Sequence, residues 1–135
     1  MNTAVKTDNI SKTYPGVLAN SNVSITINTS SIHAVVGENG AGKSTLMKIL
    51  YGMIKPDSGN IEIFNNTASI SSPKEAINLG IGMVHQHFML AKNLTVLENI
   101  ILGIDRASLK NLGLSKYKKQ IQEVMKTYSL DIDLN

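Results

Sequence analysis

The sequence predicts an α/β fold, in which a core with buried strands carries an antiparallel β subdomain and leads into the start of a helical subdomain. An apolar, β-branched run at residues 32–36 is followed at once by a glycine-rich turn and a helical pattern, the order expected in an α/β unit. Residues 23–28 and 60–64 alternate apolar and polar side chains, as half-buried antiparallel strands do. Capped helical patterns follow in the C-terminal third.

Strands and a single helix are expected in the N-terminal half. A strand at residues 4–8 precedes those named above, and turn residues at 55–59 lead into the strand at 60–64. The helix after the glycine-rich turn is expected to end near Gly52, because glycine commonly follows the last helical residue. Its apolar residues at helical spacing are Leu46, Ile49, Leu50 and Met53.

Helices dominate the expected C-terminal half. Ser72 is placed to cap a short helix, which ends before a second buried strand at residues 81–85. Thr95 and Glu98 have the spacing of a capping box, in which each side chain bonds the other's backbone N–H. A last amphipathic helix is expected at residues 115–129.

The glycine-rich turn carries the chemistry. Its sequence, Gly-Glu-Asn-Gly-Ala-Gly-Lys-Ser at residues 37–44, matches the phosphate-loop pattern G-x-x-x-x-G-K-[ST] at every fixed position. Glycines let backbone N–H groups curl around phosphate oxygens, and the next helix offers its positive N-terminal end. Lys43 is expected to reach the β- and γ-phosphates, and the Ser44 hydroxyl to ligate Mg²⁺. The expected ligand-binding residues are Gly37, Glu38, Asn39, Gly40, Ala41, Gly42, Lys43, Ser44 and Thr45.

The pattern therefore predicts a nucleoside triphosphate bound with Mg²⁺ on a P-loop NTPase core. The alternative, a glycine-rich turn without a ligand, is disfavoured by the strand pattern before the loop and the helical pattern after it. Gln86 is the next candidate, because it follows the second predicted core strand, where ligands of parallel sheets gather. Its carboxamide is suited to ligate Mg²⁺ or to orient the attacking water, and a solvent-facing glutamine is the alternative.

The composition of the chain limits the classes of function that it can have. The 135 residues suffice for one domain with a core, and the net charge of +3 is mild. Lys116, Lys118 and Lys119 share one polar helix, which favours a solvated face over a nucleic-acid surface. The absence of cysteine fits a reducing compartment. No apolar run approaches the roughly 18 residues of a membrane span, so neither secretion nor membrane insertion is expected.

The histidines do not predict a metal site. His85 and His87 occupy alternate positions of an expected strand and so share a face, but no third ligand accompanies them. Zinc is therefore disfavoured. His33 lies in the expected strand at residues 32–36, which favours a hydrogen-bonded histidine in the core.

Over nearly its whole length the chain resembles the N-terminal part of an ATP-binding-cassette (ABC) transporter ATPase. The resemblance rests on the loop at residues 37–45, the Pro-Asp-Ser-Gly turn at 56–59, the glutamine loop at Gln86 and the Asn-Leu-Thr-Val-x-Glu-Asn sequence at 93–99. Residues 80–90 resemble in particular the branch that imports simple sugars and nucleosides. The ordered set of four motifs is more specific than the loop alone.

The resemblance implies roles for further residues and partners. Tyr14 becomes the aromatic residue that stacks on adenine, with an aromatic residue closing the core as the alternative. Lys43 and Gln86 become the catalytic residues, and Ser44 and Gln86 the Mg²⁺ ligands, in an ATPase at the cytoplasmic face of the cell membrane. Implied partners are transmembrane permease subunits, a second cassette in a head-to-tail dimer and, indirectly, a solute-binding protein, with no nucleic acid.

The family's later motifs are not expected in these residues. Residues 100–105 and 130–134 are poor candidates for the strand whose aspartate holds magnesium, and no Leu-Ser-Gly-Gly-Gln sequence occurs. We therefore interpret residues 1–90 as nucleotide-binding core and residues 91–135 as an incomplete helical subdomain. Such a fragment is expected to bind ATP weakly without hydrolysing it. Three alternatives stay open: a soluble cassette ATPase, another P-loop phosphoryl-transfer enzyme, and a purely structural piece that self-associates.

Overall fold

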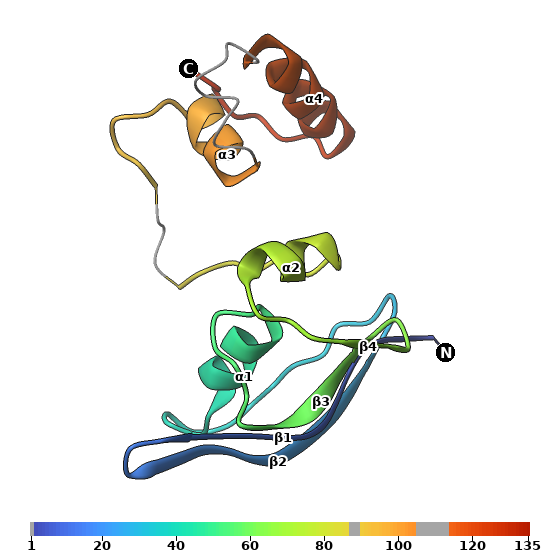
Figure 1. Ribbon diagram of the computed structural model, residues 1–135. Helices are drawn as coiled ribbons and strands as arrows, with labels where there is room; N and C mark the ends of the chain where they lie inside the picture. The colour runs from blue at the N-terminus through green and yellow to red at the C-terminus, as the bar shows by residue number, and fades with distance from the viewer. Residues whose placement is uncertain (1, 87–89, 105–113) are drawn as a thin grey trace. The chain divides into compact units, whose positions relative to one another are not determined.

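The computed structural model describes residues 2–86, 90–104 and 114–135, shown as a ribbon in Figure 1. The chain divides into two compact units, Met1–Val84 and His85–Asn135. Each unit has its own hydrophobic core. The expected division into a core up to residue 90 and a helical subdomain after it stays a prediction.

A four-stranded antiparallel sheet forms the base of the first unit. Its strands are β1 (Thr3–Tyr14), β2 (Val17–Asn28), β3 (Ser58–Ile63) and β4 (Asn66–Ala68), in the order β2-β1-β3-β4. Val5 of β1 pairs with Ile27 on one side and with Ile63 on the other. The expected antiparallel strands are thus present, and β1 and β2 run on to meet at the turn between Tyr14 and Val17.

Helix α1 (Lys43–Leu50) packs on this sheet and forms the core with it. In Figure 1 the helix lies in the curve of the sheet. Three of the four expected apolar residues of this helix are buried, whereas Met53 lies beyond its end and is half exposed. The buried residues of this core are Ile10, Leu46, Ile49, Leu50, Ile61, Ile63, Ile70 and Ala76.

Two local features complete the first unit. Strands β3 and β4 are joined at Phe64 and Asn65, which both have positive φ, 48° and 62°, as a type I′ turn requires. Helix α2 (Pro73–Asn78) begins after Ser72, whose Oγ accepts a hydrogen bond from the Glu75 N–H at 3.3 Å. The predicted cap is therefore confirmed, whereas β4 was not expected from the sequence.

The second unit contains helices α3 (Val96–Ile104) and α4 (Leu114–Thr127). Leu97 and Ile101 of α3 are buried together with Leu134, and the Leu97 N–H donates to the Leu134 carbonyl at 3.1 Å. The predicted capping box is confirmed, since Thr95 N–H donates to Glu98 Oε2 at 2.8 Å and Glu98 N–H to Thr95 Oγ1 at 3.2 Å.

The prediction of strands at residues 32–36 and 81–85 is wrong. Both segments have no regular secondary structure, and Ile32 and Val36 are almost fully exposed. A parallel strand covered on both faces needs neighbours to supply its hydrogen bonds and its burial, and among the described residues the antiparallel sheet does not extend to either segment. The expectation that His33 is a core residue is wrong for the same reason, because its whole segment is exposed.

Candidate functional site

The phosphate-loop sequence forms a compact turn that leads directly into α1. The Ala41 N–H donates to the Glu38 carbonyl at 3.2 Å, and the first helical bond joins Leu46 N–H to the Gly42 carbonyl at 2.9 Å. Gly40 and Gly42 have positive φ, 88° and 84°, a conformation that other residues adopt only at a cost. No side chain caps α1, and its first turn has no acidic residue, so no group of the helix itself neutralises its positive end.

Gly42 is also required because the loop approaches β2 closely. A Cβ atom on Gly42 would lie 2.0 Å from the Ala19 carbonyl oxygen and 2.8 Å from Asn20 Nδ2. Real Cβ atoms essentially never approach another heavy atom within 3.0 Å. The last fixed glycine of the motif therefore lets the loop rest on the backbone of β2.

Lys43 folds back over the loop that precedes it. Its Nζ donates to the Gly37 carbonyl at 2.6 Å and to the Glu38 carbonyl at 2.7 Å. These two charge-assisted bonds hold the ammonium group beside the start of the loop. The neighbouring Ser44 is exposed, so its hydroxyl is accessible to a ligand. The structure thus brings a cation, a hydroxyl and an uncapped helix end into one short segment.

Tyr14 lies at the end of β1 and is 37% exposed. It is not one of the residues of the hydrophobic core, so the structure does not support the alternative in which it closes the core. The Lys12 ammonium lies 5.9 Å from the centre of its ring, at the outer limit of a cation–π contact.

Asp57, in the Pro-Asp-Ser-Gly turn, anchors the strand end that carries Tyr14. Its carboxylate accepts hydrogen bonds from Lys12 Nζ at 2.6 Å and from the Thr13 N–H at 2.7 Å. The Lys12 hydrogen bond is the main reason that the pKa of Asp57 is lowered, and the Thr13 bond adds to it. Sequence reasoning identified this turn but missed its function of joining β3 to the end of β1.

Gln86 is exposed and belongs to the second compact unit. The segment before it is not a strand, so the argument that placed it at a strand end is not supported by the structure. Its assignment to Mg²⁺ and to water therefore stays a prediction. His87, the second member of the histidine pair, lies outside the described residues.

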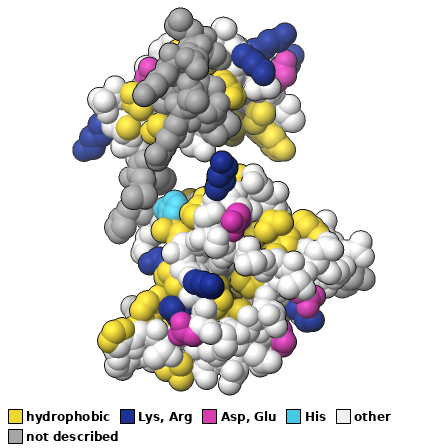
Figure 2. All heavy atoms as spheres, in the orientation of Figure 1, with side chains coloured by type: hydrophobic (Ala, Val, Ile, Leu, Met, Phe, Trp, Pro, Cys, Tyr) yellow, Lys and Arg dark blue, Asp and Glu magenta, His cyan; other side chains and the backbone are white. Residues whose placement is uncertain are grey.

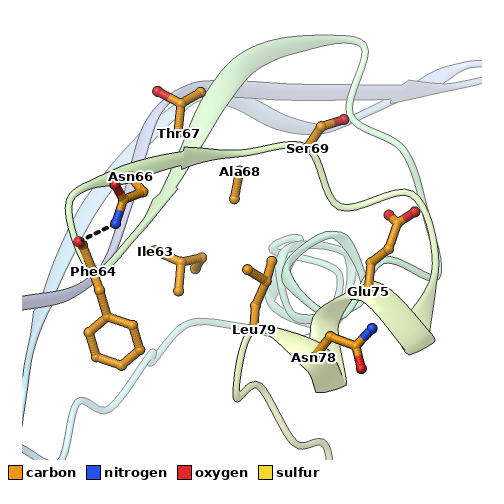
Figure 3. Close-up of a pocket in the computed structure, with 9 residues that line it drawn as sticks. All are labelled: Ile63, Phe64, Asn66, Thr67, Ala68, Ser69, Glu75, Asn78 and Leu79. Carbon is orange, nitrogen blue, oxygen red and sulfur yellow. Dashed lines mark hydrogen bonds between the residues drawn. The ribbon is translucent and has the colours of Figure 1, made fainter.

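A hollow elsewhere in the first unit is separate from the loop. It has a volume of about 590 Å³ and lies between the β3–β4 turn and α2. Figure 3 shows Ile63 and Leu79 facing each other across it, with Phe64 at its edge. No residue of the phosphate loop lines it, so the motif and the hollow are different features. Its lining residues are Ile63, Phe64, Asn66, Thr67, Ala68, Ser69, Glu75, Asn78 and Leu79.

The distribution of charge and the apolarity of the helices complete the description. In Figure 2 the lysine side chains of the described residues are interspersed with acidic ones. Within the part of the chain that the structure describes, no helix is both long enough and apolar enough to span a bilayer.

Three known proteins that are similar to this chain are all named as import ATP-binding proteins. The guanosine import ATP-binding protein NupO of Bacillus subtilis is 44% identical over 124 residues, which cover 92% of this chain and 24% of that protein. The nucleoside import ATP-binding protein NupA of Lactococcus lactis subsp. cremoris is 44% identical over 97% of this chain and 26% of its own length. The glucose import ATP-binding protein TsgD13 of Haloferax volcanii is 40% identical over 97% of this chain and 29% of its own length. The chain thus spans about a quarter of the length of these relatives.

Two solved structures that are similar to this chain are ATP-binding cassettes of ABC transporters. A nucleotide-free ATP-binding cassette from an ABC transporter matches 75% of this chain and 40% of its own, with a TM-score of 0.68 and 34% identity. A cassette in its ADP conformation matches 76% of this chain and 41% of its own, with a TM-score of 0.69 and 33% identity. These matches confirm the expected partial cassette fold. The sequence profile described as ABC transporter matches residues 20–134, and the chain therefore belongs to the ABC transporter family.

Proposed function

We propose that this chain binds ATP with Mg²⁺ at residues 37–45, as part of the ATP-binding subunit of an importer. The observation that carries the proposal is the loop itself, in which one short segment contains an uncapped helix end, the Lys43 ammonium and the exposed Ser44 hydroxyl. This donor set suits a polyphosphate, because anions are favoured at a helix N-terminus and lysine adds a point charge. The hydroxyl suits Mg²⁺, which prefers oxygen ligands.

The proposal assigns a role in nucleotide binding to each candidate site residue. The backbone N–H groups of the loop and of the first turn of α1 hold the phosphates, and Lys43 binds the β- and γ-phosphates. Ser44 is proposed to supply an oxygen ligand to Mg²⁺. Gln86 keeps only the role that the family resemblance implies, as a further Mg²⁺ ligand and as the residue that orients water. Tyr14 stacks on the adenine ring with the face that Lys12 leaves free. Mg²⁺, when bound, neutralises charge that develops on the phosphates.

The intact protein is proposed to couple ATP binding and hydrolysis to uptake of a sugar-like or nucleoside-like solute. Support comes from the relatives, whose names describe import of guanosine, nucleosides and glucose. The proposed partners are transmembrane permease subunits, a second cassette in a head-to-tail pair and, indirectly, a solute-binding protein, at the cytoplasmic face of the membrane. A soluble cassette ATPase is the second candidate, and co-purification with a membrane permease distinguishes the two.

ATP binding is tested by titrating the chain with MgATP and comparing Lys43→Met with Lys48→Met. Both lysines lie on α1 and both substitutions remove one positive charge, but Lys48 is an exposed residue in the last turn of the helix. Lys43→Met is expected to weaken ATP binding by about tenfold or more, because a charge-assisted phosphate contact is lost, and Lys48→Met by less than about twofold. Equal effects of the two substitutions would contradict the proposed site.

We further propose that the 135-residue chain by itself binds ATP without turning it over. The loop supplies ground-state contacts, whereas hydrolysis on this scaffold needs a further acid and a partner group that stabilise the transition state. The measurement is phosphate release from MgATP by the unaltered chain and by Lys43→Ala. Turnover that disappears in the Lys43→Ala variant would show that the proposal of an inactive chain is wrong.

A further inference from the structure

A buried asparagine lies directly beneath the phosphate loop. Asn20 is on β2, opposite Lys12 of β1, and only 5% of it is exposed. Its Nδ2 donates a hydrogen bond to the Gly42 carbonyl at 3.3 Å. The other end of the same carboxamide, Oδ1, is buried and accepts no hydrogen bond from any described residue.

The bond from Asn20 acts on the peptide group that joins the loop to α1. The Gly42 carbonyl also accepts the first helical bond, from the Leu46 N–H at 2.9 Å, so Asn20 adds a second donor from the side of the sheet. A peptide unit is planar and trans, so the Lys43 N–H points opposite to the Gly42 carbonyl. Holding that carbonyl therefore fixes the direction of the Lys43 N–H, which is one of the donors at the open end of the helix.

The unpaired Oδ1 makes a purely stabilising role a poor explanation. A buried acceptor without a partner lowers stability, and an apolar residue of the same shape removes that cost. Leucine has nearly the shape of asparagine, and the Gly42 carbonyl keeps its bond from Leu46 after the substitution. An asparagine whose only effect is on folding is therefore less favourable here than leucine.

We infer that Asn20 is a positioning residue for phosphate binding, which orients the Gly42–Lys43 peptide so that its N–H meets a phosphate oxygen. The inference rests on the proposed binding of ATP at the loop. It assigns part of the phosphate affinity to a residue of β2 that lies outside the motif. Adenine stacking, which involves Tyr14, is independent of this peptide group.

The test is a titration followed by backbone amide NMR, with MgATP and separately with adenosine as probes. Asn20→Leu is expected to weaken MgATP binding by about five- to tenfold, because one phosphate hydrogen bond is misdirected. Adenosine binding stays unchanged, the MgATP-induced shift of the Lys43 amide proton decreases, and the temperature of unfolding is equal or higher. Asn20→Ala is the second variant, with the same expected loss of MgATP affinity.

Thr7→Val is the matched control. Thr7 is 1% exposed in the same sheet, and its Oγ1 donates to the Val23 carbonyl and accepts from the Ile25 N–H. Its substitution also removes a buried polar group but should leave MgATP affinity unchanged.

Four results would overturn the inference while leaving the proposed function intact. They are an Asn20→Leu affinity for MgATP within twofold of the unaltered chain, parallel losses for MgATP and adenosine, an equal loss in Thr7→Val, or failure of both Asn20 variants to fold. If the unaltered chain binds no MgATP, both the proposed function and this inference are wrong.

Discussion

Replacing Gly42 by alanine tests whether the loop rests on β2. Alanine at φ 84° pays the cost of the left-handed conformation, about 1 kcal/mol. Its Cβ atom would also lie 2.0 Å from the Ala19 carbonyl oxygen, although 3.0 Å is the practical lower limit. The N-terminus of α1 must therefore move away from β2 by about 1 Å, the difference between these two distances.

That movement disturbs the core, because Leu46 and Ile49 in the same short helix are buried against the sheet. Overpacking of this kind costs about 1–3 kcal/mol. We therefore expect Gly42→Ala to lower the free energy of unfolding by about 2–4 kcal/mol in total. The measurement is urea unfolding followed by far-ultraviolet circular dichroism.

Gly40→Ala is the matched control for this prediction. Gly40 has a φ of 88°, nearly that of Gly42, but a Cβ atom there meets nothing within 4 Å. Its substitution should lower the free energy of unfolding by only about 1 kcal/mol. Because both variants share the change in the unfolded state, their difference isolates the contact with β2. Losses that agree within about 0.5 kcal/mol would refute the close approach.

Two further predictions concern contacts away from the loop. Asn99 makes four hydrogen bonds with the backbone of residues 91–95 at 2.9–3.2 Å. Asn99→Ala should therefore lower the free energy of unfolding of the second unit by about 2–3 kcal/mol, as measured by hydrogen exchange. The control is Asn93→Ala, at an exposed position, which should change this free energy by less than about 0.5 kcal/mol. The pKa of Asp57 is lowered from its ordinary value of 3.8 by Lys12, so its contribution to stability is complete above that value and is lost as the pH falls through the folded-state pKa. In acid titration the difference in stability between the unaltered chain and Asp57→Asn should therefore be constant near neutral pH and should shrink below about pH 4. A difference that grows in acid would show that the carboxylate is not stabilised by Lys12.

Local signals in the sequence predicted the features that depend on neighbouring residues. The loop could be predicted because its glycines, Lys43 and Ser44 act within one turn of each other. The caps at Ser72 and Thr95 could be predicted because a cap joins residues three positions apart. Asn99, in contrast, was identified only as part of the family's Asn-Leu-Thr-Val-x-Glu-Asn sequence, and the structure supplies its reason, since Asn99 folds the segment before α3 back onto the helix.

Features that depend on distant partners could not be predicted in the same way. The apolar pattern at residues 32–36 identifies a segment that suits a buried strand, but the pattern does not supply the neighbouring strands. The turn at Phe64 and Asn65 carries no glycine, so the usual signal of a type I′ hairpin is absent. Asn20 could not be identified either, because it lies before the strand expected at residues 23–28, and its burial beneath the loop is seen only in the folded structure.

The contacts beneath the loop show that β2, and not the motif alone, determines the geometry of the loop. A glycine-rich loop is flexible by composition, and binding a ligand to a flexible loop costs conformational entropy. Here the loop is held from the sheet side, by the approach of Gly42 to Ala19 and by the bond from Asn20, and from the helix side by the core residues of α1. Support on both sides reduces the entropy that remains to be lost on binding. The antiparallel sheet therefore supports the proposed phosphate site, and substitutions in β2 should alter nucleotide affinity without touching the motif.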